Sequence, residues 1–460
     1  MEPPIQIFRQ YDIRGIVGED LLPATARAIG RAYGTALREA RGGGGGKRPG
    51  PVAVGADNRP SSPGLCDALA TGLTEAGVDV LDLGTVPTPV TYWAEYRLGA
   101  GGAIQITGSH NPPEWNGIKM TMGRRPYFGE DIAALRERIV TDTLARGKGR
   151  RTPADVLDDY VEDISRRFQT SRPVRTVVDA GNGTGSLVAE RLLRGIGADV
   201  IPLYCDSDGT FPNHHPDPAV EENLADLVRA VQEEEADVGV AFDGDADRIG
   251  IVDETGRILA GDLLLLLLGL DVLARHGPGT LLVHDVKCSQ ALPEAFEAGG
   301  GRALMWKTGH SYIKEKMRET GAAIGGELSG HICFADDYIG TDDALYAACR
   351  LTSLLADSDR PLSELTASFP RYASTPEIRL PVTEEAKNRV VDRAAAYFRG
   401  RREVVDVDGV RILFGDGWAL LRASNTQPVL VARFEAKSQE RLLEIRDEVE
   451  GWLRGEGINV

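Results

Sequence analysis

One pattern occurs three times in the chain and limits the folds that the chain can adopt. Each copy has an apolar run ending in an acidic residue, an amphipathic segment, a glycine and a second apolar run. The copies begin at residues 52, 177 and 281. This order is typical of a βαβ unit, in which a helix joins two parallel strands. Because the copies lie about 100 residues apart, much further than solenoid repeats, the sequence predicts three similar α/β domains with mixed, largely parallel sheets.

The C-terminal part of the chain has a different pattern. A helical segment near residues 384–398 precedes four apolar runs at 404–407, 410–414, 418–421 and 429–434, and a last helical segment covers 439–454. Asp408 and Gly409 between the first two runs are typical of a hairpin turn, so we expect a small α+β domain with an antiparallel sheet. Breaks at 146–153, 253–256 and 370–372 give predicted domains of 1–153, 154–255, 256–370 and 371–460.

Charge and composition exclude some classes of function. The 460 residues carry a net charge of −17, from 52 basic and 69 acidic residues, which argues against nucleic-acid binding. The leucine run at 263–268 is too short to span a bilayer and predicts a buried helix, so no membrane partner is expected. Five scattered cysteines without metal-binding spacing, and an N-terminus unlike a signal peptide, predict a cytoplasmic protein.

A serine stands in a stiff turn at residues 107–113, TGSHNPP, after a predicted buried strand at 101–106. The two prolines cannot continue a β-ladder, and Gly108 lets the backbone bend close to the serine. We expect the Ser109 hydroxyl to be held on a rigid turn near His110 and Lys119, where it would act as a nucleophile or a phosphate carrier. An ordinary Ser-Asn-Pro turn is the structural alternative.

Three aspartates alternate with small residues in DGDADR, directly after a predicted strand at 238–242. Asp243, Asp245 and Asp247 can converge on one cation, and carboxylate oxygens of this kind suit Mg²⁺. An EF-hand is disfavoured because Arg248 replaces the required glycine and strands flank the loop. A solvated Asp-Gly turn is the remaining alternative.

Two further loops carry groups that can bind a phosphosugar. Glu327, Ser329 and His331 offer an acceptor, a hydroxyl and an imidazole to sugar hydroxyls, although a capping motif would look similar. Residues 422–428, RASNTQP, can form a phosphate cradle or a decorated hairpin turn. Further candidate cations are Arg14, Lys119, Lys287 and His310.

The segment DAGNGTG at 179–185 partly fits a dinucleotide-binding fingerprint, with Asp206 near the end of the next predicted strand. Ser186 stands where the third glycine belongs. We therefore interpret this segment as a tight structural turn.

Together, these loops resemble those of the α-D-phosphohexomutases, and most closely the bacterial phosphomannomutase/phosphoglucomutase type. TGSHNPPEWNGIK is similar to the family's phosphoserine loop, DGDADR to its metal loop, GELSGH to its sugar-specificity loop and RASNTQP to its phosphate-binding loop. The opening FRQYDIRG is similar to that of the mannose and glucose enzymes. The resemblance covers essentially the whole chain, and its departures at Trp115 and Gln427 bear on substrate preference.

The resemblance implies four domains around a central active-site cleft, with one loop from each. Ser109 would be the phosphoserine, and Asp243, Asp245 and Asp247 would hold one Mg²⁺ per chain with a phosphoserine oxygen as a further ligand. Glu327 and Ser329 would contact sugar hydroxyls, with His331 close by. The phosphate that is not transferred would bind to Arg422, Ser424, Asn425 and Thr426. The other cleft residues would be Tyr11, Arg14, His110, Lys119, Arg248, Lys287 and His310.

The implied reaction is the Mg²⁺-dependent interconversion of hexose 1-phosphate and hexose 6-phosphate, with mannose, glucose or both. A hexose 1,6-bisphosphate would be the intermediate and activator, and hexose phosphates would be the partners of a monomer or homodimer. Arg14 and Lys119 are alternatives for moving protons or stabilising charge. A phosphoglucosamine mutase, a metal-dependent sugar phosphatase and a phosphosugar- or Ca²⁺-binding module remain as alternative functions.

Overall fold

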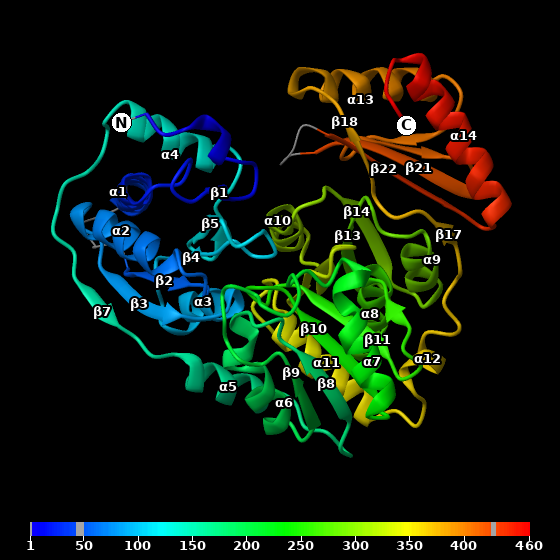
Figure 1. Cartoon of the computed structure of the whole chain (residues 1–460), viewed down its shortest axis with the longest axis horizontal. Helices are drawn as coiled ribbons and strands as arrows, with labels where there is room; N and C mark the ends of the chain where they lie inside the picture. The colour runs from blue at the N-terminus through cyan, green and yellow to red at the C-terminus, as the bar shows by residue number, and fades with distance from the viewer. Residues whose placement is uncertain (1, 43–49, 425–428) are drawn as a thin grey trace.

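Four β-sheets follow one another along the chain in the computed structural model, which describes residues 2–42, 50–424 and 429–460 (Figure 1). The first and fourth domains lie at the ends of an arc, and the second and third form its middle. The predicted fold class, three α/β domains and a C-terminal α+β domain, is confirmed. Among the described residues, no helix is both long and apolar enough to cross a membrane.

The first domain has a mixed seven-stranded sheet. Its strands are β1 (Ile13–Ile16), β2 (Val52–Ala56), β3 (Val80–Thr85), β4 (Gly102–Ile106), β5 (Trp115–Met122), β6 (Arg125–Pro126) and β7 (Arg151–Pro153). Its helices are η1 (Ile5–Ile7), α1 (Pro23–Gly42), α2 (Ser62–Glu75), α3 (Thr88–Arg97) and α4 (Glu130–Val140). The strand order is β1-β5-β4-β2-β3-β7, with β6 paired to β5. Central strands β2 and β4 are buried at every residue, as expected for parallel strands that are covered on both faces.

The second domain has five strands, β8 (Arg175–Asp179), β9 (Asp199–Leu203), β10 (Val238–Phe242), β11 (Ile249–Asp253) and β12 (Ile258–Leu259). Its helices are α5 (Leu157–Ser165), η2 (Thr184–Leu187), α6 (Ala189–Gly195), η3 (Glu221–Leu224) and α7 (Ala225–Glu233). The order is β12-β11-β10-β8-β9, in which β8 pairs in parallel with β9 and β10. Since β12 pairs with β11, the second sheet continues past residue 255, where the sequence predicted that this domain would end.

The third domain has four strands in the order β14-β13-β15-β16: β13 (Leu281–Asp285), β14 (Arg302–Trp306), β15 (Ile324–Gly326) and β16 (Ile332–Phe334). Its helices are α8 (Gly261–His276), α9 (Ala291–Ala298), α10 (His310–Thr320), α11 (Ala344–Ala356) and α12 (Leu362–Leu365). The leucine run lies in α8 and is largely buried, which confirms the predicted buried helix. One cluster of buried apolar side chains continues from the first domain through the second into the third.

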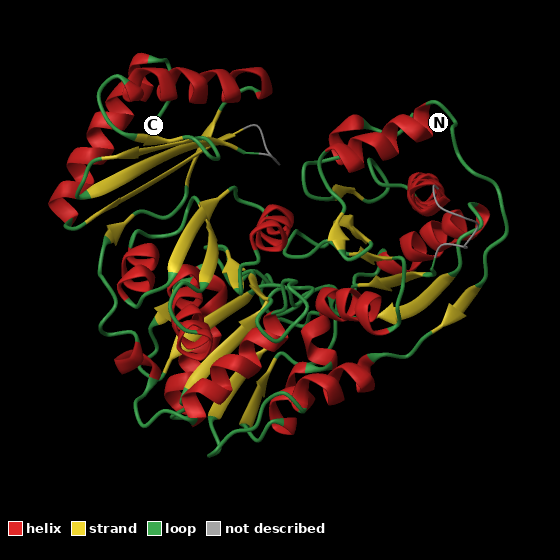
Figure 2. Cartoon of the chain, turned by 180° about the vertical axis from the view of Figure 1, so that it is seen from behind, coloured by secondary structure: helices red, strands yellow, loops and turns green. Residues whose placement is uncertain are grey.

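The fourth domain has an antiparallel sheet of β17 (Ala373–Ser374), β18 (Ile378–Pro381), β19 (Val404–Val405), β20 (Val410–Leu413), β21 (Gly417–Ala423) and β22 (Val429–Ala436), with helices α13 (Glu384–Arg399) and α14 (Gln439–Gly455). The helices cover the face that points away from the rest of the chain (Figure 2). Alternation along β21 explains this: Ala419 and Leu421 pack against the helices, whereas Trp418 and Leu420 pack against Val286 of the third domain.

Candidate active site

The turn between β4 and β5 presents Ser109 to the second domain. Ser109 is buried and has φ +51°, a left-handed conformation that is uncommon for residues other than glycine. Its Oγ donates a hydrogen bond to Asp243 Oδ2 over 2.9 Å and lies 3.1 Å from His110 Nδ1. The structure therefore brings together the two predicted elements of phosphoryl transfer, the serine and the acidic loop.

The loop between β10 and β11 carries three buried aspartates, Asp243, Asp245 and Asp247. Each offers a carboxylate oxygen, and these oxygens lie within 4.8 Å of one another. Among the described residues, the buried Asp245 Oδ1 has no hydrogen-bond partner. Burial and repulsion from Asp245 and Asp247 raise the pKa of Asp243 well above its usual range. Hard oxygen donors that need further positive charge fit a divalent cation such as Mg²⁺.

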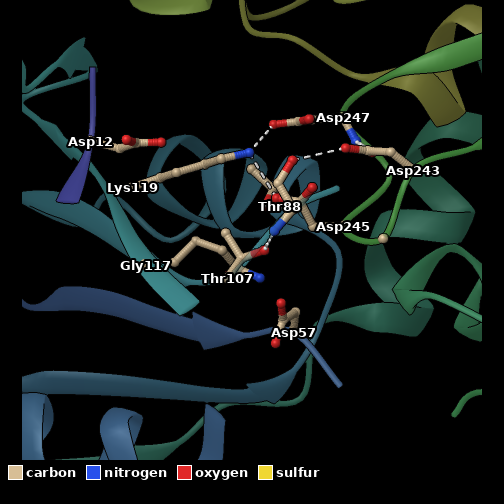
Figure 3. A network of polar contacts seen from close by, with 12 residues as sticks. Asp12, Asp57, Thr88, Thr107, Gly117, Lys119, Asp243, Asp245 and Asp247 are labelled. Carbon is tan, nitrogen blue, oxygen red and sulfur yellow. Dashed lines mark hydrogen bonds and ion pairs between the residues drawn. The ribbon is translucent and has the colours of Figure 1, made fainter. Parts of the chain in front are cut away.

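Lys119 reaches from β5 into the same cluster (Figure 3). Its Nζ donates to Asp245 Oδ2 over 2.8 Å and also forms an ion pair with Asp247. Burial lowers the pKa of Lys119, but the three aspartates outweigh this effect and raise the pKa above its usual value. The site thus contains one fixed ammonium group against three carboxyl groups.

The loop between β15 and β16 joins this cluster through His331. His331 Nε2 lies 3.2 Å from Asp247 Oδ1, and Nδ1 lies 3.0 Å from Glu327 Oε2. Burial lowers the pKa of His331, but Asp247 and Glu327 outweigh it and raise the pKa to about 9. Burial raises the pKa of Glu327, but His331 and Lys287 bring it to about 2. Backbone pairing supports the contact, because Ile249 N–H donates to Gly330 O over 3.1 Å.

The other predicted cleft residues make contacts around these loops. Arg14 Nε donates to Asp12 Oδ2 over 2.7 Å and its Nη1 donates to Asn111 Oδ1 over 3.2 Å, so Arg14 adjoins the serine turn. Arg248 Nη1 lies 3.8 Å from Asp217 Oδ1. The ring of His310 stacks on His331 with centroids 5.3 Å apart.

Two contacts of the predicted residues reach across domains. The Tyr11 hydroxyl donates to Thr308 O over 2.8 Å, which connects the N-terminal segment to the third domain. Lys287 Nζ lies 2.7 Å from Glu377 Oε1, at the start of the fourth domain's β18. Both predicted substrate-binding residues are therefore already held by protein groups.

The fourth predicted loop meets the third domain through Asp408. Asp408 Oδ2 accepts hydrogen bonds from Arg422 Nε over 3.1 Å and from Thr308 N–H over 3.0 Å. Ser424 is buried, and its carbonyl accepts a hydrogen bond from Lys387 over 2.7 Å. Asn425 and Thr426 lie outside the described residues.

Comparison with models of protein families finds matches along nearly the whole chain. Four models described as phosphoglucomutase/phosphomannomutase match it in order: alpha/beta/alpha domain I at residues 5–145, domain II at 158–256, domain III at 260–372 and the C-terminal domain at 377–451. The chain belongs to the phosphoglucomutase/phosphomannomutase family.

Individual members of the family support this assignment. A phosphomannomutase/phosphoglucomutase from Pseudomonas aeruginosa is 46% identical over 96% of this chain and 94% of its own length. A phosphoglucomutase from Neisseria meningitidis is 42% identical over 96% and 95%. The crystal structure of a phosphoglucomutase/phosphomannomutase family protein from Burkholderia thailandensis has a TM-score of 0.91 and 44% identity, covering 99% of this chain and 98% of that one.

The sequence analysis did not identify several residues that make contacts with the candidate site residues and their loops. Thr88 donates to Asp245 Oδ2 over 2.5 Å, and Asp342 Oδ2 lies 3.0 Å from His310 Nδ1. Asp57 and Arg59 hold the serine turn from behind. A signal for Asp57 was present, because it ends the first of the three repeated strand patterns. The other residues have no comparable local pattern.

The DAGNGTG segment packs against the metal loop. Thr184 N–H donates to Gly244 O over 2.9 Å, and a Cβ at Gly183 would lie 2.7 Å from the same oxygen. The glycine is therefore required for close approach of two backbones. This contact supports the interpretation as a structural turn.

Proposed function

We propose that this family member interconverts hexose 1-phosphates and hexose 6-phosphates of mannose and glucose, with Ser109 as the phosphate carrier. The observation that carries the proposal is the contact of Ser109 Oγ with Asp243, beside two further aspartates and Lys119. The names of the relatives, phosphomannomutase/phosphoglucomutase and phosphoglucomutase, indicate the substrate class.

Asp243, Asp245 and Asp247 would hold Mg²⁺, with an oxygen of phosphorylated Ser109 as a further ligand. A phosphoserine carries a charge of about −1.5 to −2. Because Ser109 Oγ lies 2.9 Å from Asp243 Oδ2, a phosphate on this oxygen would be strongly repelled by the carboxyl groups without a cation. When bound, the ion neutralises charge on the phosphoryl group during transfer.

In the proposed first transfer, the phosphoryl group leaves Ser109 Oγ for the free hydroxyl of a hexose monophosphate. The Oγ–P bond breaks, a sugar O–P bond forms, and the hydroxyl proton passes to a nearby base. Lys119 and Arg248 stabilise negative charge at this position. Lys119, Arg14 and His310 remain the candidates for handling the proton.

The resulting bisphosphate turns around and returns its other phosphate to Ser109. Glu327, Ser329 and His331 would contact the sugar, with Tyr11, His110 and Lys287 completing its surroundings. Arg422, Ser424, Asn425 and Thr426 would grip the phosphate that is not being transferred. Arg422 Nη2 is suited to this role because it is buried and has no hydrogen-bond partner among the described residues.

The proposal is tested by following each sugar 1-phosphate in the presence of Mg²⁺ and a trace of glucose 1,6-bisphosphate. We expect mannose 1-phosphate and glucose 1-phosphate to give 6-phosphates, with kcat/KM values that differ by no more than about 200-fold. Glucosamine 1-phosphate should react more slowly than either. Release of inorganic phosphate without isomerisation would instead identify a phosphatase, and preference for glucosamine 1-phosphate would identify a phosphoglucosamine mutase.

A further inference from the structure

Arg59 is almost completely buried behind the serine turn, with 1% of its surface exposed. Its Nη1 donates to Pro112 O over 2.6 Å and to Trp115 O over 3.2 Å. Its Nη2 donates to Ser109 O over 2.8 Å and to Asn111 O over 2.6 Å. One side chain therefore donates to four carbonyls, three in the irregular serine turn and one, Trp115 O, at the start of β5.

Asp57 holds both this arginine and the start of the turn. Its Oδ2 accepts hydrogen bonds from Arg59 Nε over 3.1 Å and from Gly108 N–H over 2.9 Å. A Cβ at Gly108 would lie 2.4 Å from Arg59 Cζ, so the loop passes very close to the guanidinium group. Asp57, Arg59 and the serine turn therefore form one hydrogen-bonded unit.

The second domain packs against the same unit. The Phe211 ring lies over the Arg59 guanidinium with its centroid 5.1 Å from Cζ, a cation–π contact. A Cβ at Gly209 would lie 2.6 Å from Arg59 Cα, and a Cβ at Gly244 would lie 2.5 Å from Ser109 O. Arg59 therefore lies between the serine turn and the domain that carries the metal loop.

We propose that Asp57 and Arg59 are positioning residues for phosphoryl transfer at Ser109. They fix the carbonyls of the turn, and thereby the left-handed backbone of Ser109 that aims Oγ at Asp243. Arginine is required because its planar group donates in several fixed directions, whereas a lysine ammonium is a single flexible point charge. The role of the pair rests on the proposed function of Ser109.

This role predicts a loss of kcat with little change in KM. A displacement of about 1 Å at the reacting atom costs about 100-fold in rate, whereas the residues proposed to grip the sugar and its other phosphate lie in other loops. We therefore expect Arg59→Lys to lower kcat about 100-fold and to change KM less than about threefold.

Arg350→Lys is the matched control. Arg350 is equally buried, at 1% exposure, but its guanidinium pairs with Asp271 and Asp336 of the third domain, each at 2.8 Å. We expect this variant to lose thermal stability and to keep the wild-type kcat. Both variants are assayed with glucose 1-phosphate, Mg²⁺ and glucose 1,6-bisphosphate, and their melting temperatures are measured in parallel.

Gly108→Ala gives a second route to the same displacement, because the added Cβ would push the guanidinium away while position 59 keeps its arginine. It should reproduce the selective loss of kcat. Three results would overturn the positioning role. They are a wild-type kcat in a folded Arg59→Lys variant, an equal loss of kcat in Arg350→Lys, and failure of both Arg59→Lys and Gly108→Ala to fold. An inactive wild-type protein would instead count against the proposed function itself.

Discussion

At the scale of single residues, two of the three clustered aspartates have opposite pKa shifts because their surroundings differ. Asp247 faces Lys119 and His331, whereas Asp243 faces the neutral hydroxyl of Ser109 and two backbone N–H groups. Burial raises the pKa of Asp247, but Lys119 and His331 outweigh it and lower the pKa well below the usual range. The Asp243 end of the cluster is therefore where additional positive charge is needed most.

Replacing one of these carboxylates tests the metal site. Asp245→Asn removes a negative charge and a hard donor, so the Mg²⁺ concentration for half-maximal activity should rise at least about 10-fold. An Mg²⁺ titration of the initial rate measures this. The exposed Asp206 of the same domain provides the control, since Asp206→Asn should titrate as wild type. Unchanged Mg²⁺ dependence in Asp245→Asn would contradict the assignment.

Replacing Glu327 tests how the sugar is held. Glu327 is ionised at neutral pH, and it accepts a hydrogen bond from Gly309 N–H over 2.6 Å as well as contacting His331. We expect Glu327→Gln to lower kcat/KM for glucose 1-phosphate and mannose 1-phosphate together, by on the order of 100-fold. Glu319→Gln, at an exposed position on α10, is the control. Loss of only one substrate would show that Glu327 reads the hydroxyl at which the two sugars differ.

At the scale of elements, local patterns predicted those strands and helices whose burial follows their own sequence. The runs that became β10, β13 and α8 are apolar and buried. The repeated pattern also correctly indicated the parallel pairing of β2 with β3, β8 with β9 and β13 with β14. Pairings between distant segments were not predictable in this way. Strand β1 pairs with β5, from Ile13 with Ile118 to Ile16 with Trp115, and no local pattern encodes that partner.

The candidate site shows the same limit. Glycine and proline residues allowed the candidate serine, metal and sugar loops to be recognised in the sequence. The side chains that hold these loops in place could not be recognised in the same way. Arginine is seldom fully buried, so nothing near Arg59 indicated that its side chain lies inside the fold. Asp342 likewise meets His310 only through tertiary packing.

The close packing of α1 and α2 gives a test of the first domain. A Cβ at Gly72 would lie 2.0 Å from Arg27 O, whereas a Cβ at Gly64 of the same helix has open space. Gly72→Ala should therefore destabilise the domain by more than about 2 kcal/mol. Gly64→Ala should be neutral or should stabilise it by about 0.5 kcal/mol. Thermal unfolding measures both changes, and equal melting temperatures for the two variants would contradict the packing.

At the scale of the whole molecule, the fourth domain is attached differently from the first three. The first three share one continuous apolar core. The fourth has its own core and packs on the third through an apolar cluster that includes Val286, Trp418 and Leu420 and through polar contacts, among them that of Arg411, which donates to Val286 O over 2.7 Å. Residues 370–372 connect them between α12 and β17. A separate apolar core and a single chain connection favour movement of the fourth domain as a unit.

We therefore expect the fourth domain to close when a hexose phosphate binds. Small-angle scattering should show a smaller radius of gyration at saturating glucose 1-phosphate. Arg422→Ala should weaken this response because it removes a group proposed to grip the phosphate. Scattering that does not change at saturation would contradict closure. An undiminished response in Arg422→Ala would show that closure does not depend on Arg422.

Phosphoryl transfer through Ser109 is most directly tested by following the phosphate itself. The protein is loaded with radiolabelled glucose 1,6-bisphosphate and Mg²⁺, the labelled residue is mapped by mass spectrometry, and the phosphoenzyme is then mixed with unlabelled glucose 1-phosphate. We expect the label on Ser109, its transfer to the sugar at least as fast as kcat, and no loading in Ser109→Ala, whose turnover should fall at least about 1,000-fold. Label on another residue, a phosphoenzyme that the sugar does not discharge, or near-wild-type turnover in Ser109→Ala would contradict the account.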